Sequence, residues 1–245
     1  MAHDQDVTDE VDVNLRPPAA VAGRLLALVG LARRGFLEQP LEMIADDTPE
    51  AERYDLISWL EEERLAEFLT PLERAILNAP IGSLSPEDTA AATWGIEGAA
   101  VLAWALRSIP ELAGYDEATN AATVIDVLPA TWSRTTEFRA AAMLRDEPDI
   151  AQARERAEVW HDRADLYWMI QDGWEDEDAE PRAVVQRMAG EAHAAGLIVA
   201  PIAGDFVSRG GVYRDLAPDT VETLELIAFH RLVEFNWLCG LIDHA

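Results

Sequence analysis

Three helix starts of one kind constrain the fold of this chain most. A hydroxyl residue, a proline and an early acid follow one another at Thr48-Pro49-Glu50, Thr70-Pro71-Leu72-Glu73 and Ser85-Pro86-Glu87-Asp88. The hydroxyl oxygen caps free backbone N–H groups, the proline fits the first helical position, and an acid is stabilised at the positive end of the helix. The chain is therefore predicted to consist of successive helices.

Apolar residues after these starts recur at intervals of three and four, which is the spacing of a helix with one buried face. The same spacing predicts further helices over residues 18–37, 135–144, 149–171 and 181–195. The segment near 86–107 is apolar on nearly every side, so we expect it to be the central helix, and a C-terminal helix is expected near 218–240. The predicted fold class is an all-α, single-domain multi-helix bundle.

The length of 245 residues is near the upper limit for one hydrophobic core. A hydrophobic fraction of 49% and a charged fraction of 27% are those of a globular protein rather than a disordered chain. Residues 1–16 are acidic and contain few large apolar side chains, so they are predicted to form a mobile arm. Residues 17–245 are predicted to form one helical domain.

The charge of the chain is strongly negative, because 46 acidic residues stand against 19 basic ones and give a net charge of −27. Every basic residue is an arginine, and the chain contains no lysine. This composition excludes Schiff-base, pyridoxal phosphate and P-loop lysine chemistry, since each needs a side-chain amine. A field of this sign repels nucleic acid and anionic membranes and attracts cations. We therefore expect a basic protein partner, no nucleic acid and no membrane.

Few other features point to a compartment or a cofactor. The single cysteine, Cys239, cannot form an internal disulfide, and the N-terminus lacks the basic-then-apolar pattern of a secretory leader, so the cytoplasm is expected. No Gly-x-Ser-x-Gly motif is present, and Gly210-Gly211 lacks the context of a phosphate-binding loop. No cofactor, metal or catalytic residue is predicted.

Glu97 and Arg231 are the first candidate site residues. An ionised carboxylate on an otherwise apolar helix is costly unless a cation or several donors face it. Arg231, on the last helix, is the expected partner of Glu97. The favoured interpretation is a buried ion pair between two core helices, and the alternative is a catalytic acid with a shifted pKa.

His161 and Trp174 are the other two candidates. Glu158 and His161 form a Glu-x-x-His pair, but a di-iron bundle needs a second such pair, which the chain lacks. A histidine packed in the core or paired with Asp165 is therefore favoured over a metal ligand. Trp174 lies within the acidic segment 172–180, where a half-buried loop residue is favoured over an anchor for a partner.

Four segments carry a resemblance to a known family. They are Trp94-Gly95-Ile96-Glu97 before an apolar run to Leu106, Phe138-Arg139 with Trp160-His161-Asp162-Arg163, Asp205-Phe206 with Tyr213-Arg214-Asp215-Leu216, and His230-Arg231 with Asn236-Trp237-Leu238-Cys239-Gly240. In order and spacing, over residues 20–240, they resemble the bacterial domain of unknown function family 4272. The resemblance implies an all-helical cytoplasmic protein without an assigned activity. The chain departs from the family at His230-Arg231, where members often have Glu-Arg-His.

These observations favour a non-enzymatic acidic module that binds a basic protein, with an immunity-type protein that neutralises a cationic toxin as one specific form. Two alternatives remain open. The first is an enzyme with an interhelical pocket formed by Glu97, His161 and Arg231. The second is a scaffold that oligomerises through its last helix.

Overall fold

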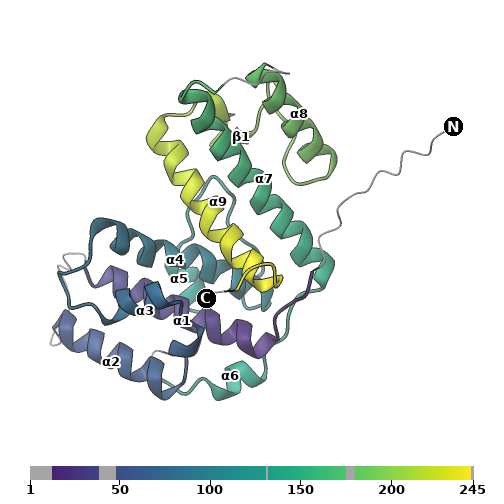
Figure 1. The fold of residues 1–245 in the computed structure, drawn as a ribbon. Helices are drawn as coiled ribbons and strands as arrows, with labels where there is room; N and C mark the ends of the chain where they lie inside the picture. The colour runs from purple at the N-terminus through teal and green to yellow at the C-terminus, as the bar shows by residue number, and fades with distance from the viewer. Residues whose placement is uncertain (1–12, 39–47, 131, 175–179, 244–245) are drawn as a thin grey trace.

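The computed structural model describes residues 13–38, 48–130, 132–174 and 180–243. Within these residues the chain is built from helices and one small antiparallel hairpin, β1 (Val207–Ser208) and β2 (Gly211–Val212), in which Val207 pairs with Val212 (Figure 1). The predicted all-α fold is therefore confirmed. No helix in the described part of the chain is both long and apolar enough to cross a membrane.

The helices follow one another through the described part of the chain. In chain order they are α1 (Pro18–Phe36), α2 (Pro49–Glu62), α3 (Pro71–Asn78), α4 (Pro86–Ala105), α5 (Ala121–Ile125), α6 (Thr136–Ala140), α7 (Glu147–Gln171), α8 (Pro181–Ala194) and α9 (Pro218–Leu238), with short 3-10 turns η1 (Ala66–Phe68) and η2 (Tyr213–Asp215). The central and C-terminal helices expected near 86–107 and 218–240 correspond to α4 and α9.

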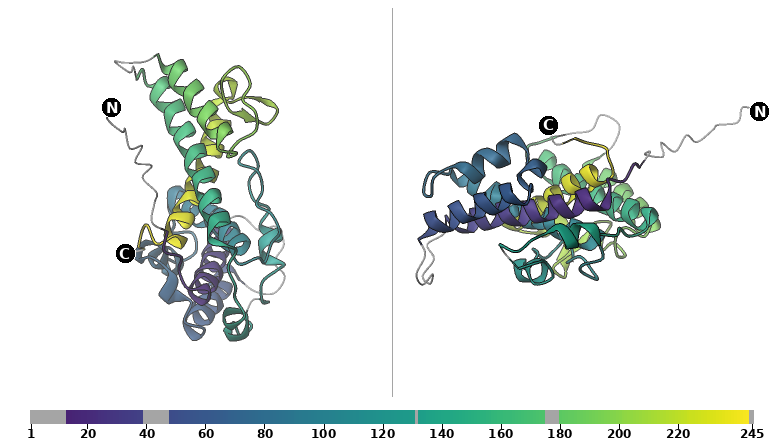
Figure 2. Two further views of the ribbon diagram at one scale, coloured as in Figure 1. Left: turned by 90° about the vertical axis from the view of Figure 1, so that its right-hand side faces the viewer. Right: turned by 90° about the horizontal axis from the view of Figure 1, so that it is seen from below.

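Four long helices form the frame of the molecule. Helix α1 packs along α4, α4 packs against α9, and α9 packs against α7. Figures 1 and 2 show α7 and α9 running side by side away from the α1–α4 pair, with α8 beside α7 and with α2 and α3 beside α1. Helix α9 therefore belongs to both parts of the molecule.

The three predicted helix starts are present as capped N-termini. The side-chain oxygens of Thr48, Thr70 and Ser85 accept hydrogen bonds from backbone N–H groups at 3.3, 3.1 and 3.0 Å. At α3 the cap is reciprocal, because the Glu73 carboxylate accepts a hydrogen bond from the Thr70 backbone N–H at 2.8 Å. These contacts satisfy N–H groups that a helix leaves unpaired in its first turn.

The N-terminal segment is fixed to the end of α9 from Asn14 onwards. The backbone N–H groups of Asn14 and Arg16 donate to the carbonyls of Cys239 and Leu238 at 3.0 and 2.9 Å. The Arg16 side chain also donates to the carbonyl of Trp237, where a cation stabilises the negative end of a helix. The mobile arm over 1–16 therefore stays a prediction: Asn14 and Arg16 are hydrogen-bonded to the end of α9, and residues 1–12 lie outside the described part of the chain.

Close packing of α1 on α4 depends on small side chains. A Cβ atom added at Gly35 would lie 2.8 Å from the Thr93 Cγ2 atom and 3.0 Å from the Thr93 backbone nitrogen. Neither distance is compatible with normal van der Waals contact, and the nitrogen belongs to a helix that cannot yield locally. Glycine at position 35 therefore sets the separation of the two helices.

Substitution Gly35→Ala should lower the free energy of unfolding by about 1–3 kcal/mol, because the added methyl group overpacks the α1–α4 contact. The matched control is Gly190→Ala on α8, where a Cβ meets nothing within 4 Å. Alanine there should raise stability by about 0.5–1 kcal/mol through helix propensity. Urea unfolding followed by circular dichroism measures both, and equal effects of the two substitutions would refute this account of the contact.

Candidate functional site

Several charged side chains are buried among the described residues, and arginines outnumber acids among them. The buried arginines of the described residues are Arg24, Arg34, Arg53, Arg154, Arg163 and Arg231, and the buried acids are Glu97, Asp205 and Glu234. A buried charge is tolerated only when it is paired and hydrogen-bonded. Each of these six arginines has a carboxylate within ion-pair distance.

The expected pairing of Glu97 with Arg231 is present. Arg231 Nη2 lies 2.8 Å from Glu97 Oε2, and both side chains are 0% exposed. The Glu97 carboxylate also accepts hydrogen bonds from the backbone N–H and the hydroxyl of Thr119, at 2.6 and 2.8 Å. Helices α4 and α9 are thereby joined to each other and to the segment before α5.

The Arg231 guanidinium also donates hydrogen bonds to backbone carbonyls of the segment between α4 and α5. Its Nη1 donates to the carbonyl of Ala113 at 2.7 Å, and its Nη2 lies within 3.4 Å of the carbonyl of Glu117. The Tyr115 ring stacks on it at 4.9 Å, and burial raises the pKa of Tyr115 to about 12. Both members of the ion pair are therefore engaged in holding residues 113–119 against the core.

A groove of about 190 Å³ lies between α1, α3, α4 and α9, and we call it the charged groove. Its charged side chains are Arg24, Glu73 and Glu234, and His230 lies beside them. Its apolar walls include Leu28, Leu31, Leu72, Ile76, Phe229 and Val233. A mostly apolar hollow with a few converging polar groups is the usual form of a binding site.

Arg24 is the centre of the charged groove. Its Nη1 and Nη2 atoms lie 2.6 and 2.8 Å from the two carboxylate oxygens of Glu73, and its Nη2 and Nε lie 2.6 and 3.3 Å from those of Glu234. Burial lowers the pKa of Arg24, but Glu234 and Glu73 outweigh this effect and hold its pKa above the ordinary value. One guanidinium therefore contacts two carboxylates.

His230 borders this cluster and is kept neutral by its surroundings. Its ring lies stacked on Trp94, with 6.5 Å between ring centroids. Burial lowers its pKa below the ordinary value of 6.5, although Glu234, Glu97 and Glu73 act in the opposite direction. A neutral imidazole offers one hydrogen-bond donor and one acceptor to a ligand.

Two glycines of α4 shape the floor of the charged groove. A Cβ atom added at Gly98 would lie 2.4 Å from the Glu234 Cγ atom, so glycine is required for Glu234 to reach Arg24. A Cβ at Gly95 would lie at ordinary contact distances of 3.9 and 4.0 Å from Leu28 and Leu31. A methyl group at position 95 therefore fits, and it would lie at the lining of the groove.

The remaining two candidates lie apart from this cluster. The His161 Nε2 atom lies 3.7 Å from Asp165 Oδ2, and its ring lies 5.9 Å from that of Phe229, on the wall of the charged groove. Trp174 is half-buried just after α7, and residues 175–179 of the acidic segment lie outside the described part of the chain. No group of three or more potential metal ligands is found among the described residues.

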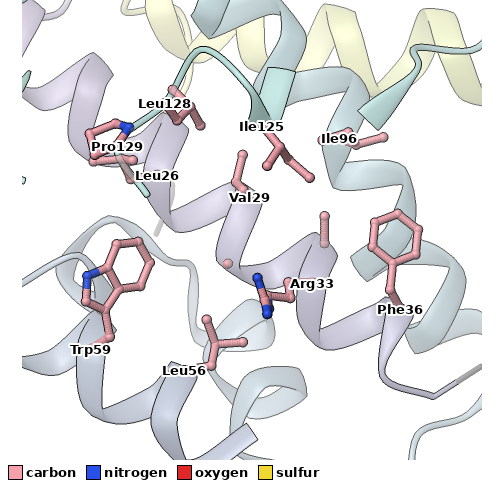
Figure 3. A pocket seen from close by; sticks show the side chains of 12 residues that line it. Leu26, Val29, Arg33, Phe36, Leu56, Trp59, Ile96, Ile125, Leu128 and Pro129 are labelled. Carbon is pink, nitrogen blue, oxygen red and sulfur yellow. The ribbon is translucent and has the colours of Figure 1, made fainter. Parts of the chain in front are cut away.

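A second hollow, between α1, α2, α4 and α5, is apolar and smaller, about 80 Å³ (Figure 3). Leu26, Val29, Trp59 and Ile96 are among its lining residues. Arg33 reaches it but is ion-paired with Glu52. This hollow lacks the converging charges that distinguish the charged groove.

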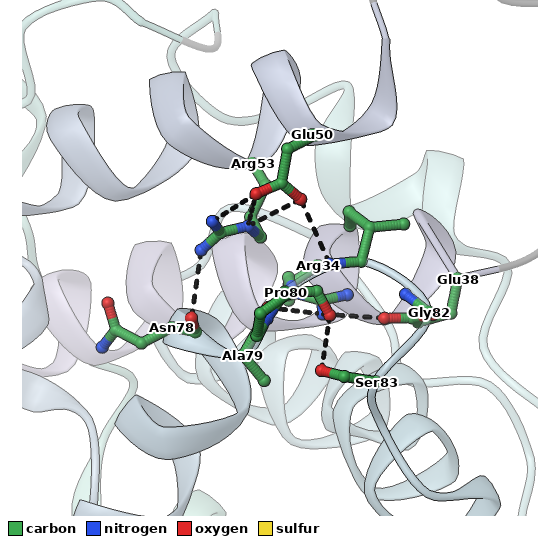
Figure 4. Close-up of polar contacts among 10 residues, drawn as sticks. Arg34, Glu38, Glu50, Arg53, Asn78, Ala79, Pro80, Gly82 and Ser83 are labelled. Atoms are coloured by element: carbon green, nitrogen blue, oxygen red, sulfur yellow. Dashed lines mark hydrogen bonds and ion pairs between the residues drawn. The ribbon is translucent and has the colours of Figure 1, made fainter.

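Arg34 and Arg53 hold the connection between α3 and α4 (Figure 4). Arg53 pairs with Glu50 at 2.6 Å and donates to the Asn78 carbonyl, while Arg34 pairs with Glu38 at 2.7 Å. The pKa of the Glu50 carboxyl is lowered, and its hydrogen bond with Arg53 is the largest cause. The network fixes the turn after α3 through its hydrogen bonds with residues 78–81.

Comparison with known proteins identifies a family but no activity. A family model described as "Domain of unknown function (DUF4272)" matches residues 2–195, and the chain belongs to this family. The first two resembling segments, around Glu97 and His161, lie within the match, whereas those around Asp205 and Arg231 lie beyond it. No curated protein and no solved structure matches the chain.

Sequence reasoning missed Arg24, Glu73 and Glu234 as members of a site. Arg24 interrupts the apolar run from Val21 to Ala32, which is the same signal that pointed to Glu97 in α4. Glu73 was explained by its helix cap, and the cap is real. The second role of Glu73, as partner of Arg24, depends on the packing of α3 against α1.

Substitution Arg231→Met should lower the free energy of unfolding by about 3–5 kcal/mol, because it leaves Glu97 buried without its cation. The double variant Glu97→Leu/Arg231→Met should recover part of this loss, since it removes the uncompensated charge. Urea unfolding of the two variants and the wild type measures these differences in stability. A double variant that is less stable than Arg231→Met would contradict the ion-pair account.

Stability should also depend on His230 below pH 6.5. The folded protein disfavours protonation of this buried ring, whereas the unfolded chain protonates it near the ordinary pKa of 6.5. As pH falls through that value the unfolded state binds more protons, so stability declines. His230→Gln should lose less stability than wild type between about pH 7.5 and about pH 5.5. An identical decline in both proteins would show that His230 does not contribute.

Proposed function

We propose that this protein is a non-enzymatic binding protein that docks a basic partner protein at the charged groove. The observation that carries the proposal is the composition of the groove. Two carboxylates converge on one guanidinium, and apolar side chains surround them. Such a hollow is complementary to a cationic side chain with an apolar stem.

The distribution of charge over the molecule supports a cationic partner. Among the described residues, burial removes six arginines but only three acids from the surface. The surface is therefore even richer in negative charge than the net charge of −27 indicates. A field of this kind accelerates the encounter with a basic protein and disfavours acidic ones.

The rim of the charged groove has the character of a protein-binding surface. Leu72 is 62% exposed and Phe229 is 44% exposed, although both are large apolar residues. They lie on α3 and α9, on two walls of the same groove. Exposed apolar side chains around a hollow are typical of the anchoring regions of protein interfaces.

An enzyme built on Glu97, His161 and Arg231 receives no support from the geometry. Glu97 and Arg231 are fully buried and occupied by the chain before α5, whereas His161 lies on α7 beside Asp165 and Phe229. An immunity-type role, in which the protein neutralises a cationic toxin, is one form of the proposed binding. It differs from other forms only in the identity of the partner.

The proposal is tested by selecting random peptides on the immobilised protein by phage display, at low and at moderate salt. We expect selected peptides to be rich in basic residues and to be released by salt. Substitution Gly95→Leu should abolish their binding, because Gly95 lines the charged groove and a Cβ atom there makes only ordinary contacts with Leu28 and Leu31. The control is Gly190→Leu on α8, which adds the same side chain away from the groove.

Two results would overturn the proposal. One is the selection of peptides without an excess of basic residues. The other is equal binding of the selected peptides to both leucine variants, which would place the binding surface outside the charged groove.

A further inference from the structure

We infer that the charged groove receives a single primary ammonium group, the side chain of a lysine in the partner, in preference to a guanidinium. The inference rests on the proposed function and specifies the chemistry of its anchor. It is drawn from three properties of the groove: its net charge, the geometry of its carboxylates and the nature of its walls.

The net charge of the groove fits one monovalent cation. Glu73 and Glu234 carry two negative charges, Arg24 carries one positive charge, and Arg24 is the one arginine among the residues that line the groove in the described structure. His230 is neutral near pH 7 because burial lowers its pKa. The charged residues that line the groove therefore sum to one negative charge, which a single added cation would neutralise.

The geometry of the carboxylates favours a compact cation over a planar one. Arg24 contacts both oxygens of Glu73 and both oxygens of Glu234, so the bidentate edge of each carboxylate is already occupied by a guanidinium. A second guanidinium would have to give up the fork-to-fork geometry that makes arginine a strong partner. An ammonium acts as a point charge with three rotatable donors and does not need that edge.

Among the three charged side chains of the groove, Glu73 is the one that a cation from solvent can reach most easily. The Glu73 side chain is 17% exposed, whereas those of Arg24 and Glu234 are 1% and 5% exposed. An incoming cation therefore meets a carboxylate first and remains further from the positive charge of Arg24. This order of burial lowers the repulsion that a second cation would otherwise experience.

The walls suit the alkyl stem of a lysine. Leu28, Leu31, Ile76 and Phe229 line the groove and can cover four methylene groups, which an amphipathic side chain buries while its charged end binds. The neutral ring of His230 supplies a hydrogen-bond acceptor beside the carboxylates. Apolar walls with a charged floor thus match the two parts of this side chain.

The composition of the chain argues against a second copy as the occupant. The sequence contains 19 basic residues, all of them arginines, and no lysine. No side chain of another copy can supply the primary ammonium, so the lysine must come from a different protein. This distinguishes the inference from self-association through α9.

The test uses three peptides, acetyl-Ala-Leu-Xaa-Leu-Ala-amide with lysine, arginine or norleucine at Xaa, titrated into the full-length protein at low salt. The readout is the NMR signals of the His230 ring and the Trp94 indole, which lie beside the groove. We expect the lysine peptide to bind at least about tenfold more tightly than the norleucine peptide and more tightly than the arginine peptide. The Gly95→Leu variant should lose these shifts, and Gly190→Leu should keep them.

The outcomes separate this inference from the proposed function. Arginine binding as tightly as lysine, with loss in Gly95→Leu, would overturn the ammonium preference and leave the groove as a site for basic partners. Equal binding of lysine and norleucine would overturn the role of charge in the anchor. Peptides from phage display that bind normally to Gly95→Leu would overturn the proposed docking site itself.

Discussion

The arrangement of the N-terminal helices depends on one buried guanidinium. Arg24 projects from α1, is 1% exposed, and contacts Glu73 of α3 and Glu234 of α9, as well as the carbonyl of Phe68. An arginine inside an apolar helix is costly unless its donors are satisfied, so the positions of α3 and α9 are coupled to its presence. Because two carboxylates meet one cation, the same contact that joins the helices leaves a negative charge at the surface of the groove between them.

Buried arginine–carboxylate pairs join other elements of the fold as well, and they also affect the charge of the surface. Arg231 with Glu97 joins α9 to α4, and Arg163 with Asp205, at 2.8 Å, joins α7 to the segment before the hairpin. Arginine suits these positions because its planar fork satisfies a carboxylate through two hydrogen bonds. Each buried arginine removes one positive charge from the protein surface. Because more arginines than acids are buried among the described residues, the surface carries a larger negative charge than the whole chain. The architecture and the proposed preference for cations therefore have a common cause.

Much of the fold could be predicted from the sequence because it is encoded locally. The caps at Thr48, Thr70 and Ser85 act within one turn, and periodicity located α4 and α9 to within a few residues. The Glu97–Arg231 pair followed from the cost of a lone charge on an apolar helix. The charged groove did not follow, because it requires the packing of four helices far apart in the chain. Trp174 and His161 stood out by composition and spacing, which do not reveal what a side chain faces.

The central claim is that the charge left uncompensated by Arg24 attracts the partner's cation, and a double-mutant cycle tests it most directly. The cycle combines Glu73→Gln in the protein with lysine→norleucine in the peptide; the glutamine oxygen can still accept from the Thr70 backbone N–H, while the charge and one acceptor for Arg24 are lost. The account predicts a coupling free energy of at least about 1 kcal/mol between the two changes. The control Glu67→Gln, at an exposed acid outside the groove, should show almost none. Equal coupling for both glutamates would mean that the general acidic field, and not the charged groove, binds the cation.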